Sequence, residues 1–278
     1  MRLENGETIP YDVASLNLGS LPDFSGAPGA SEHAIGVKPF EPFIARWNEL
    51  MGKLSAQGAR EPRIGIAGAG AAGVELAMAM MFALNQQGRR AKVVVFSDKD
   101  SFTPDVSARV RRALTRLSIE LRGNTPASAV EPGPVLVSAA GREPFDAVFW
   151  AAGAAALHWL SESGLKTDPA GFVQIDAALR SVTHPEVFAA GDCASLERNP
   201  LPKSGVYAVR QGPVLAANLK RAILGKALER YEPQAKTLYL ISCGGKYAIA
   251  NRGNWSAEGR WAWTWKNWID RRWIARFS

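Results

Sequence analysis

The hydrophobic pattern of the chain is clearest in its central part. A short apolar run at 63–67 is followed by a glycine-rich turn, a long Ala- and Met-rich stretch that ends near Gly88, and a second apolar run at 92–97. Short apolar runs bounded by turn residues predict buried strands, and the long stretch between them predicts a helix. Strand, helix and strand in this order form a βαβ unit of the length that a parallel crossover requires. The pattern therefore predicts an α/β fold.

Similar patterns on both sides extend the predicted fold. Apolar residues at helical spacing from Phe43 to Leu54 predict an amphipathic helix over 39–54. Residues 16–36 are rich in Gly, Pro and Ser and predict a loop, which follows one short strand within 8–18. The segments 131–134 and 141–144 are expected to be turns that make the neighbouring strands antiparallel. The other predicted elements are a basic helix at 105–117, strands at 119–121, 128–131, 135–139, 147–151, 172–175 and 187–190, a helix at 205–224, a hairpin at 237–249 and a Trp- and Arg-rich terminal helix.

Composition and charge exclude several classes of protein. With 278 residues, 47% of them apolar and 21% charged, the chain is long enough for about two domains with a sizeable core. Cys193 and Cys243 lie far apart with only three histidines in the chain, which excludes a disulfide scaffold, a zinc-ribbon spacing and a CxxC redox pair. No metal site is predicted. The net charge of +7 suits an anionic cofactor, a nucleic acid or an acidic membrane surface.

The location of the protein follows from the absence of a recognisable targeting pattern. The amino terminus resembles neither a signal peptide nor a transit peptide, so a cytoplasmic location is expected. The stretch 64–84 is long and apolar enough to suggest a membrane span, but the glycines inside it favour another interpretation.

The glycines of that stretch form the motif Gly68-Ala-Gly70-Ala-Ala-Gly73, between a predicted strand and a predicted helix. In such a motif the first glycine permits a tight turn, the second lets a pyrophosphate approach the backbone, and the third lets helix and strand pack closely. The helix amino terminus offers free N–H donors to the phosphates. The motif therefore predicts dinucleotide binding. Ser97 and Asp98 are the candidates for the ribose-binding position after the second strand, whereas Lys99 could attract a 2′-phosphate; NAD is slightly favoured over NADP.

Three motifs occur in an order that resembles the pyridine nucleotide-disulfide oxidoreductase superfamily. They are Gly68-Ala-Gly-Ala-Ala-Gly-Val-Glu-Leu-Ala77, Phe149-Trp-Ala-Ala-Gly153 and Val187-Phe-Ala-Ala-Gly-Asp-Cys-Ala194. Without a CxxC, the closer likeness is to the type II NADH dehydrogenase-like branch. The segments 206–218 and 247–272 resemble the flavoprotein module fused to selenophosphate synthases in some bacteria. The resemblance covers nearly all of the chain.

This resemblance implies a Rossmann-like NAD(P)H-binding domain inserted in an FAD-binding domain. The implied segments are 1–38 for the distal part of the first half of the FAD domain, 39–160 for the NAD(P)H-binding domain, 161–230 for the second half of the FAD domain and 231–278 for a small hairpin-helix interface element. The implied activity is FAD-dependent NAD(P)H dehydrogenation, in which a hydride passes to the flavin and electrons then pass to a quinone or another small-molecule acceptor.

The resemblance also assigns roles to individual residues. Asp192 is expected to bond the ribityl chain of the flavin, whereas Lys203 either adds positive charge there or is a solvated surface lysine. Glu75, the expected catalytic residue, either lies near the nicotinamide and relays protons or only compensates the helix dipole. Cys193 is expected to be buried and inert. The implied cofactor-binding residues are Gly68, Gly70, Gly73, Asp98, Gly153, Gly191, Asp192, Lys203 and Gln211.

One departure from the family pattern bears on the flavin. Residues 11–20 resemble the strand that ends the first half of the flavin domain, and the segment that normally precedes it carries the first glycine motif for FAD. That segment is expected to be missing, so the flavin domain is expected to be incomplete and to expose an unpaired sheet edge. The alternative function is therefore a nucleotide-binding or partner-binding remnant that does not hold FAD.

The carboxyl-terminal segment carries six of the nine tryptophans, interleaved with basic residues. Trp261, Trp265, Trp268 and Ile269 share one face of the expected helix. This helix either packs on the protein itself, on a second copy or on a partner domain of the selenophosphate synthase type, or contacts an anionic membrane surface peripherally. Packing is favoured, and nucleic acid is not expected as a partner.

Overall fold

The structure is a computed structural model that describes residues 3–56 and 61–276. The chain forms two compact units, each made of two separate stretches. Unit 1 consists of Met1–Leu21 and Ala154–Ala235, and unit 2 of Pro22–Gly153 and Lys236–Ser278. Residues 22–38, which we expected with the first segment, group with unit 2 because the strand Ile35–Gly36 pairs there with Ala147–Trp150.

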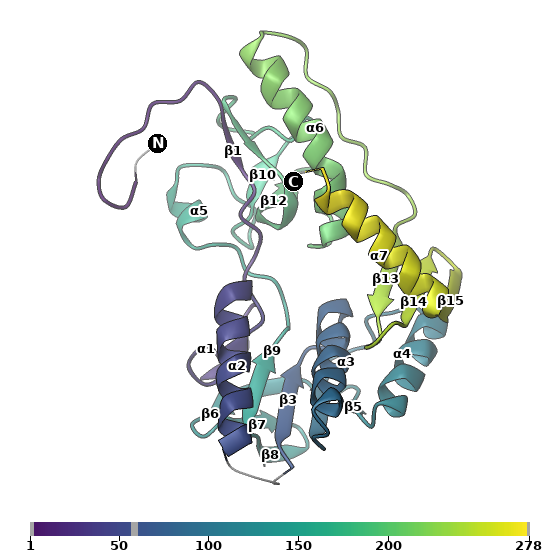
Figure 1. Ribbon diagram of the computed structural model, residues 1–278. Coiled ribbons are helices and arrows are strands. Elements are labelled where there is room, and N and C mark those ends of the chain that lie inside the picture. The colour runs from purple at the N-terminus through teal and green to yellow at the C-terminus, as the bar shows by residue number, and fades with distance from the viewer. Residues whose placement is uncertain (1–2, 57–60, 277–278) are drawn as a thin grey trace. The chain divides into compact units, whose positions relative to one another are not determined.

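Unit 2 is built on a parallel sheet of five strands in the order β2-β9-β3-β4-β5 (Figure 1). The predicted βαβ unit is confirmed, with Ile64 of β3 opposite Val93 of β4 in a parallel pair. The fold class, α/β with a Rossmann-like nucleotide-binding arrangement, is therefore as predicted. The strands are β2 (Ile35–Gly36), β9 (Ala147–Trp150), β3 (Arg63–Ala67), β4 (Lys92–Phe96) and β5 (Glu120–Arg122), and the helices are α2 (Phe40–Ala56), α3 (Ala71–Gln86) and α4 (Pro104–Arg116).

The two faces of this sheet bury different elements because side chains alternate along each strand. Ile64, Val93 and Phe149 point to one face, where they form a core with α2, α3 and α4. Val94 and Val148 point to the other face and pack with the strands β6 (Ala127–Glu131) and β7 (Val135–Ser138). The helix α1 (Ala30–His33) covers the same face. Both α1 and β2 lie in the segment that we expected to be loop, so that prediction is wrong for these residues.

The second face carries a three-stranded antiparallel sheet, β6-β7-β8. Residues 141–144, which we expected to be a turn, form its third strand β8 (Gly141–Pro144), in which Arg142 lies opposite Val137. The prediction failed because Gly141 and Pro144 stand at the two ends of this short edge strand, where neither residue interrupts the pairing.

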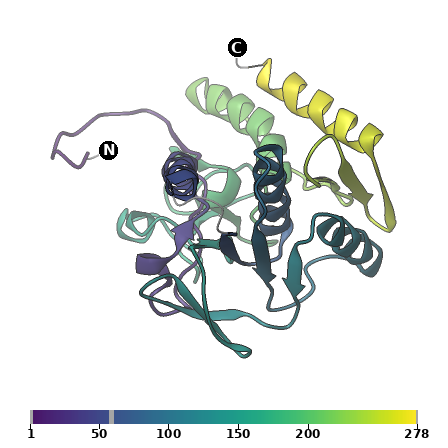
Figure 2. The ribbon, with the colours of Figure 1, turned by 60° about the horizontal axis from the view of Figure 1, so that its bottom comes forward.

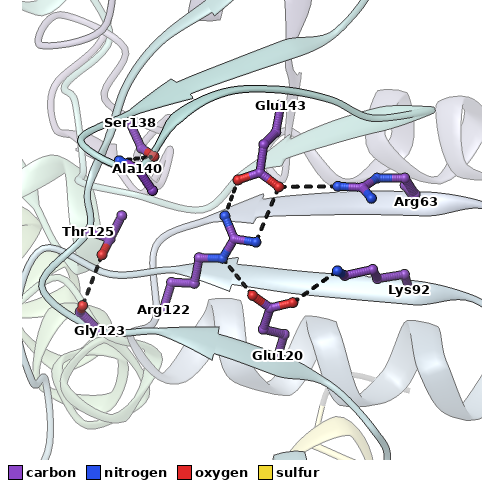
Figure 3. A network of polar contacts seen from close by, with 9 residues as sticks. All are labelled: Arg63, Lys92, Glu120, Arg122, Gly123, Thr125, Ser138, Ala140 and Glu143. Carbon is purple, nitrogen blue, oxygen red and sulfur yellow. Dashed lines mark hydrogen bonds and ion pairs between the residues drawn. The ribbon is translucent and has the colours of Figure 1, made fainter.

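A chain of charged side chains connects the five-stranded parallel sheet of unit 2 with the sheet β6-β7-β8 (Figure 3). Glu143 of β8 accepts hydrogen bonds from Arg63 of β3, at 3.1 Å, and from Arg122 of β5. Arg122 also donates to Glu120 at 2.6 Å, and Glu120 pairs with Lys92 of β4 at 3.3 Å. These contacts lower the pKa of Glu120, mainly through the hydrogen bond from Arg122. The network fixes the antiparallel sheet against the edge of the parallel one.

The carboxyl-terminal stretch of unit 2 folds into the antiparallel sheet β13-β14-β15 and the helix α7 (Arg260–Ile274). Its strands are β13 (Leu238–Ser242), β14 (Ala248–Arg252) and β15 (Trp255–Gly259), of which β15 was not predicted. Figure 2 shows α7, in yellow, lying along this sheet. Ile241 and Ile249 join the core of α3 and α4, and Ala262 of α7 is fully buried against Ala248 and Ala250.

Unit 1 contains two small parallel pairs of strands. β1 (Ala14–Leu16) pairs with β11 (Val187–Ala189), and β10 (Val173–Ile175) pairs with β12 (Ala194–Leu196). The long helix α6 (Gly205–Ile223) packs on this group through Leu215. The unit is completed by the short helix α5 (Trp159–Glu162) and the 3-10 turn η1 (Gly191–Cys193).

The apolar stretch 64–84 forms β3, the glycine turn and α3. Its apolar side chains contribute to the core that the parallel sheet shares with α2, α3 and α4. Within residues 3–56 and 61–276, no helix combines the length and the apolar character that crossing a membrane requires.

Candidate functional sites

The glycine motif forms the turn between β3 and α3 in unit 2, and its three glycines have different surroundings. Gly68 has φ +103°, and a Cβ there would lie 2.9 Å from the carbonyl carbon of Ala151. A Cβ at Gly73 would come within 1.9 Å of the Gly68 carbonyl oxygen. Gly70 precedes α3 with φ −68°, and nothing lies within 4 Å of the Cβ position there. The turn therefore needs glycine at 68 and 73 for its own packing, while Gly70 borders open space at the amino terminus of α3.

A pocket lies beyond this turn, at the carboxyl ends of β4 and β5. Ser97 follows β4 directly and is buried, whereas Asp98 is exposed and outside the pocket lining. Asp100 lines the pocket, and the Ser107 hydroxyl, which donates to it, lowers its pKa. The sequence-predicted ribose position is thus occupied by Ser97, and Asp98 points elsewhere. The pocket is lined by Ala69, Val74, Ser97, Lys99, Asp100, Ser101, Phe102, Ser107, Val110, Arg111, Leu121, Gly123 and Asn124.

Glu75 lies in the first part of α3 and is largely shielded from solvent. Its Oε1 accepts a hydrogen bond of 2.7 Å from the backbone N–H of Ser242 in β13. Burial raises the pKa of Glu75, although this hydrogen bond and the charge of Lys266 on α7 oppose the rise. Lys266 itself pairs with Asp270 at 3.5 Å. Glu75 is therefore a partly buried carboxyl group held between α3, β13 and α7, and its hydrogen bond to β13 goes beyond a compensation of the helix dipole.

Gly153 lies just after β9, close to the backbone that Gly68 approaches. It has φ +66°, and a Cβ there would lie 2.5 Å from the Cβ of Asp23. The backbone N–H of Asp23 donates to Ala152, and the indole of Trp150 donates to the carbonyl oxygen of Asp23 at 2.8 Å. Gly153 is thus required for the close approach of these two segments of unit 2.

A second candidate site lies in unit 1, where Gly191, Asp192, Lys203 and Gln211 line one pocket with the start of α6. The N–H of Gly191 donates to Gln211 Oε1 at 2.6 Å, and Asp192 Oδ2 accepts a hydrogen bond of 3.1 Å from the Ser20 hydroxyl. Gly191 has φ +75°, which favours glycine. The four residues expected from the sequence to bind the flavin are therefore brought together.

Lys203 is not a solvated surface lysine. Its ammonium group donates to the carbonyl oxygen of Ala194 at 2.7 Å and lies 3.7 Å from the ring centre of Phe172. Burial lowers its pKa, against the opposing effect of Asp168 and Asp192. The neighbouring Cys193 is buried, and burial raises the pKa of its thiol, so the thiolate is disfavoured.

Sequence reasoning did not find the partners of these residues. Ser20 lies 172 positions before Asp192, and Ser242 lies 167 positions after Glu75. No local pattern marks either of them, because each contact is made only when distant stretches of the chain meet in one unit. Among the described residues, no group of three His, Cys, Asp or Glu side chains could hold a metal ion.

Several curated proteins are similar to this chain. An NADH dehydrogenase-like protein of Mycobacterium tuberculosis is 28% identical over 200 residues, which is 68% of this chain and 50% of that protein. The demethylphylloquinone reductase of Synechocystis is 24% identical over 247 residues, or 86% of this chain and 61% of that protein. A type II NADH:quinone oxidoreductase of Staphylococcus epidermidis is 23% identical over 248 residues, 80% of this chain and 61% of that protein. The chain thus spans about half the length of the first of these relatives.

Solved structures show the same fold. The sulfide:quinone oxidoreductase of Aquifex aeolicus matches with a TM-score of 0.78 and 16% identity, over 99% of this chain and 71% of that one. The NDH2 protein of Plasmodium falciparum in complex with NADH matches with a TM-score of 0.77 and 13% identity, over 96% of this chain and 75% of that one. The family described as pyridine nucleotide-disulphide oxidoreductase matches residues 1–212. Because this match covers most of the 278 residues, including both candidate sites with their glycines, the chain belongs to the pyridine nucleotide-disulphide oxidoreductase family.

Proposed function

We propose that this chain acts in FAD-dependent oxidation of NAD(P)H, with electrons passing from the flavin to a quinone or another small acceptor. The observation that carries the proposal is the open space at Gly70. The fold needs glycine at 68 and 73 but leaves room at 70 above the amino terminus of α3, and a pyrophosphate would use that room.

The nucleotide side of the proposal assigns each glycine a task. Gly68 and Gly73 shape the turn, and Gly70 lets the phosphates approach the first N–H groups of α3. The adenosine end of the dinucleotide would lie in the pocket that Ser97, Lys99 and Arg111 line. Asp98 is left out of this site because its side chain is exposed and does not line the pocket.

The residues of unit 1 fit one end of a flavin nucleotide. Asp192 offers a carboxylate for ribityl hydroxyls, and Lys203 places a partly desolvated ammonium group in the same pocket as the start of α6. Cationic groups and helix amino termini stabilise negative charge in a water-poor site. FAD, when bound, supplies the hydride-accepting and electron-passing chemistry, and the residues named here hold and orient it.

Glu75 is proposed to exchange a proton with solvent or with the acceptor. Its pKa is raised by burial, so the carboxyl group takes up a proton at higher pH than an exposed glutamate. The Ser242 N–H fixes one oxygen of the group, which leaves the other oxygen for a proton or a ligand amide. Quinone as the acceptor is supported by two similar proteins, the demethylphylloquinone reductase and the type II NADH:quinone oxidoreductase. Association with a second copy, with a selenophosphate synthase-like domain or with a membrane surface remains a further prediction.

The test is the visible spectrum of the purified chain before and after addition of FAD, followed by NADH or NADPH. We expect the visible absorption of bound flavin, and we expect this absorption to decrease when NADH or NADPH reduces the flavin. Asp192→Ala should lose flavin but keep nucleotide binding, whereas Asp12→Ala, an exposed aspartate of the same unit, should change neither.

Gly70→Ala tests the nucleotide side separately. The added methyl group meets nothing in the fold, so the melting temperature should stay unchanged. Nucleotide affinity should fall by about tenfold or more, that is by at least about 1.4 kcal/mol. Gly52→Ala, where a Cβ also meets nothing, is the matched control.

Retained flavin in Asp192→Ala would contradict the flavin assignment. Binding of nucleotide without flavin by the unaltered chain would identify a nucleotide-binding protein instead of a dehydrogenase.

A further inference from the structure

The pocket at the carboxyl ends of β4 and β5 lies just after the second strand of the βαβ unit. In a Rossmann-like unit, the ribose next to adenine lies at the end of the second strand. A carboxylate there accepts hydrogen bonds from the ribose hydroxyls of NAD, and a nearby cation accommodates the 2′-phosphate of NADP. The inference below rests on the proposed function, since it concerns the same nucleotide site.

No carboxylate occupies the end of β4. Ser97 stands there, only 5% exposed, and its hydroxyl donates to the carbonyl oxygen of Lys99 at 2.5 Å. The next residue, Asp98, has a side chain that is 64% exposed and lies 3.8 Å from the ammonium group of Lys99. It is not part of the pocket lining. The acid that the sequence suggested for the ribose is therefore directed to solvent.

The one carboxylate in the lining, that of Asp100, is committed to the start of α4. Its Oδ1 accepts hydrogen bonds from the Ser107 hydroxyl and from the N–H of Phe102, the latter at 3.4 Å. The Ser107 hydroxyl has the largest part in lowering the pKa of Asp100. This aspartate thus organises the loop that carries Lys99 and Ser101 through its Oδ1, while its Oδ2 accepts from Arg111 at 3.5 Å.

Two cations complete the lining, and both are loosely held. The side chains of Lys99 and Arg111 are 78% and 54% exposed, and their contacts with Asp98 and Asp100 are long, at 3.8 and 3.5 Å. Exposed ion pairs of this kind contribute little stability, so either cation turns toward a stronger anion at small cost. A phosphate is such an anion, because its oxygens match the planar guanidinium in a bidentate arrangement.

We infer that this pocket binds the 2′-phosphate of NADP(H) through Lys99 and Arg111, and that the chain prefers NADPH over NADH. The slight preference for NAD suggested by the sequence depended on Asp98, which the structure places outside the pocket.

The experiment is a calorimetric titration of the full chain with 5′-AMP and with adenosine 2′,5′-bisphosphate (2′,5′-ADP) at equal ionic strength. These two ligands differ only in the 2′-phosphate, so its contribution to binding is measured without flavin or turnover. We expect 2′,5′-ADP to bind about tenfold more tightly, as a charge-assisted contact to phosphate requires. Lys99→Ala and Arg111→Ala should each reduce this preference, and the double variant should abolish it without changing the affinity for 5′-AMP. Asp98→Ala should weaken neither ligand.

Arg112→Ala is the matched control, because Arg112 follows Arg111 on α4 but pairs with Glu258 of β15 at 3.3 Å. It should leave the preference unchanged. Equal or weaker binding of 2′,5′-ADP would overturn the inference while leaving the proposed nucleotide site intact. Weaker binding of 5′-AMP by Asp98→Ala would overturn it too, because Asp98 would then be the residue that binds the ribose. Failure of both nucleotides to bind would overturn the inference and the proposed function together.

Discussion

At the scale of single residues, Glu75 shows how the environment changes the chemistry of a common side chain. Glu49 on α2 is exposed, and the hydrogen bond from Lys53 lowers its pKa. Glu75 on α3 is partly buried, and burial raises its pKa. The pKa values of these two glutamates, both on helices of unit 2, are therefore shifted in opposite directions. Of the two, Glu75 keeps its proton to the higher pH.

Glu75→Gln should remove a pH dependence from the stability of unit 2. A carboxyl group with a raised pKa binds more protons in the folded state than in the unfolded state. Its contribution to stability is present below the ordinary pKa of 4.5 and is lost as pH rises through the folded value. Each unit of pKa increase corresponds to about 1.4 kcal/mol. Glutamine stays neutral and can still accept the Ser242 N–H, so the variant should gain stability relative to the wild type as pH rises.

Urea unfolding at several pH values between about 4 and 8 measures this effect. Glu49→Gln is the control, because its lowered pKa gives the opposite sign and the group is exposed. A constant difference between Glu75→Gln and the wild type over this range would show that Glu75 is not buried in its uncharged form.

At the scale of secondary-structure elements, the sequence correctly predicted the helices and strands that a local residue pattern defines. The run 63–67, the glycine turn and α3 were found because strand, turn and helix follow one another within a short stretch. Strand β8 was missed because Gly141 and Pro144 are typical turn residues. Strand β15 alternates apolar and polar residues in Trp255–Gly259, but it was missed because the hairpin was expected to end at residue 249. The glycines at the candidate sites were predictable, whereas Ser20, Ser242 and Asn218, which depend on distant contacts, were not.

Asn218 anchors helix α6 in unit 1. It is fully buried, and its Nδ2 donates to the carbonyl oxygens of Ala178 and Glu229, each at 2.8 Å. Its Oδ1 accepts the N–H of Glu229 at 2.7 Å. Asn218→Ala removes these three hydrogen bonds to the partly buried Ala178 and the exposed Glu229, so at about 1 kcal/mol for each bond we expect unit 1 to lose about 3 kcal/mol.

Denaturant unfolding followed by far-ultraviolet circular dichroism measures this loss. Asn85→Ala, an exposed asparagine on α3, should change stability by less than about 0.5 kcal/mol. A loss in Asn218→Ala as small as that of the control would mean that water or another side chain replaces the three hydrogen bonds.

At the scale of the whole molecule, each unit depends on two distant stretches of the chain. The last stretch of unit 2, Lys236–Ser278, follows the second stretch of unit 1 in the sequence. The expectation that residues 231–278 form an interface element stays a prediction, and on the exposed face of this stretch Trp255, Trp261 and Trp268 are about half exposed. Its inner face belongs to the core of α3 and α4, where a Cβ at Gly244 would lie 3.0 Å from the Met78 carbonyl oxygen.

A chain that ends at Ala235 should therefore not fold unit 2 stably. It lacks Ile241 and Ile249, which are 3% and 0% exposed, and each such side chain contributes about 1.5–3 kcal/mol when buried. Their combined loss, about 3–6 kcal/mol, is a large part of the stability of a typical domain, which is about 5–15 kcal/mol. Thermal unfolding and light scattering should show a lower midpoint and aggregation. Trp268→Ser in the full chain, which changes a side chain that is 55% exposed, should melt as the wild type does. If the shortened chain instead melts cooperatively at the midpoint of the full chain, Lys236–Ser278 is a separate module that only rests on α3 and α4.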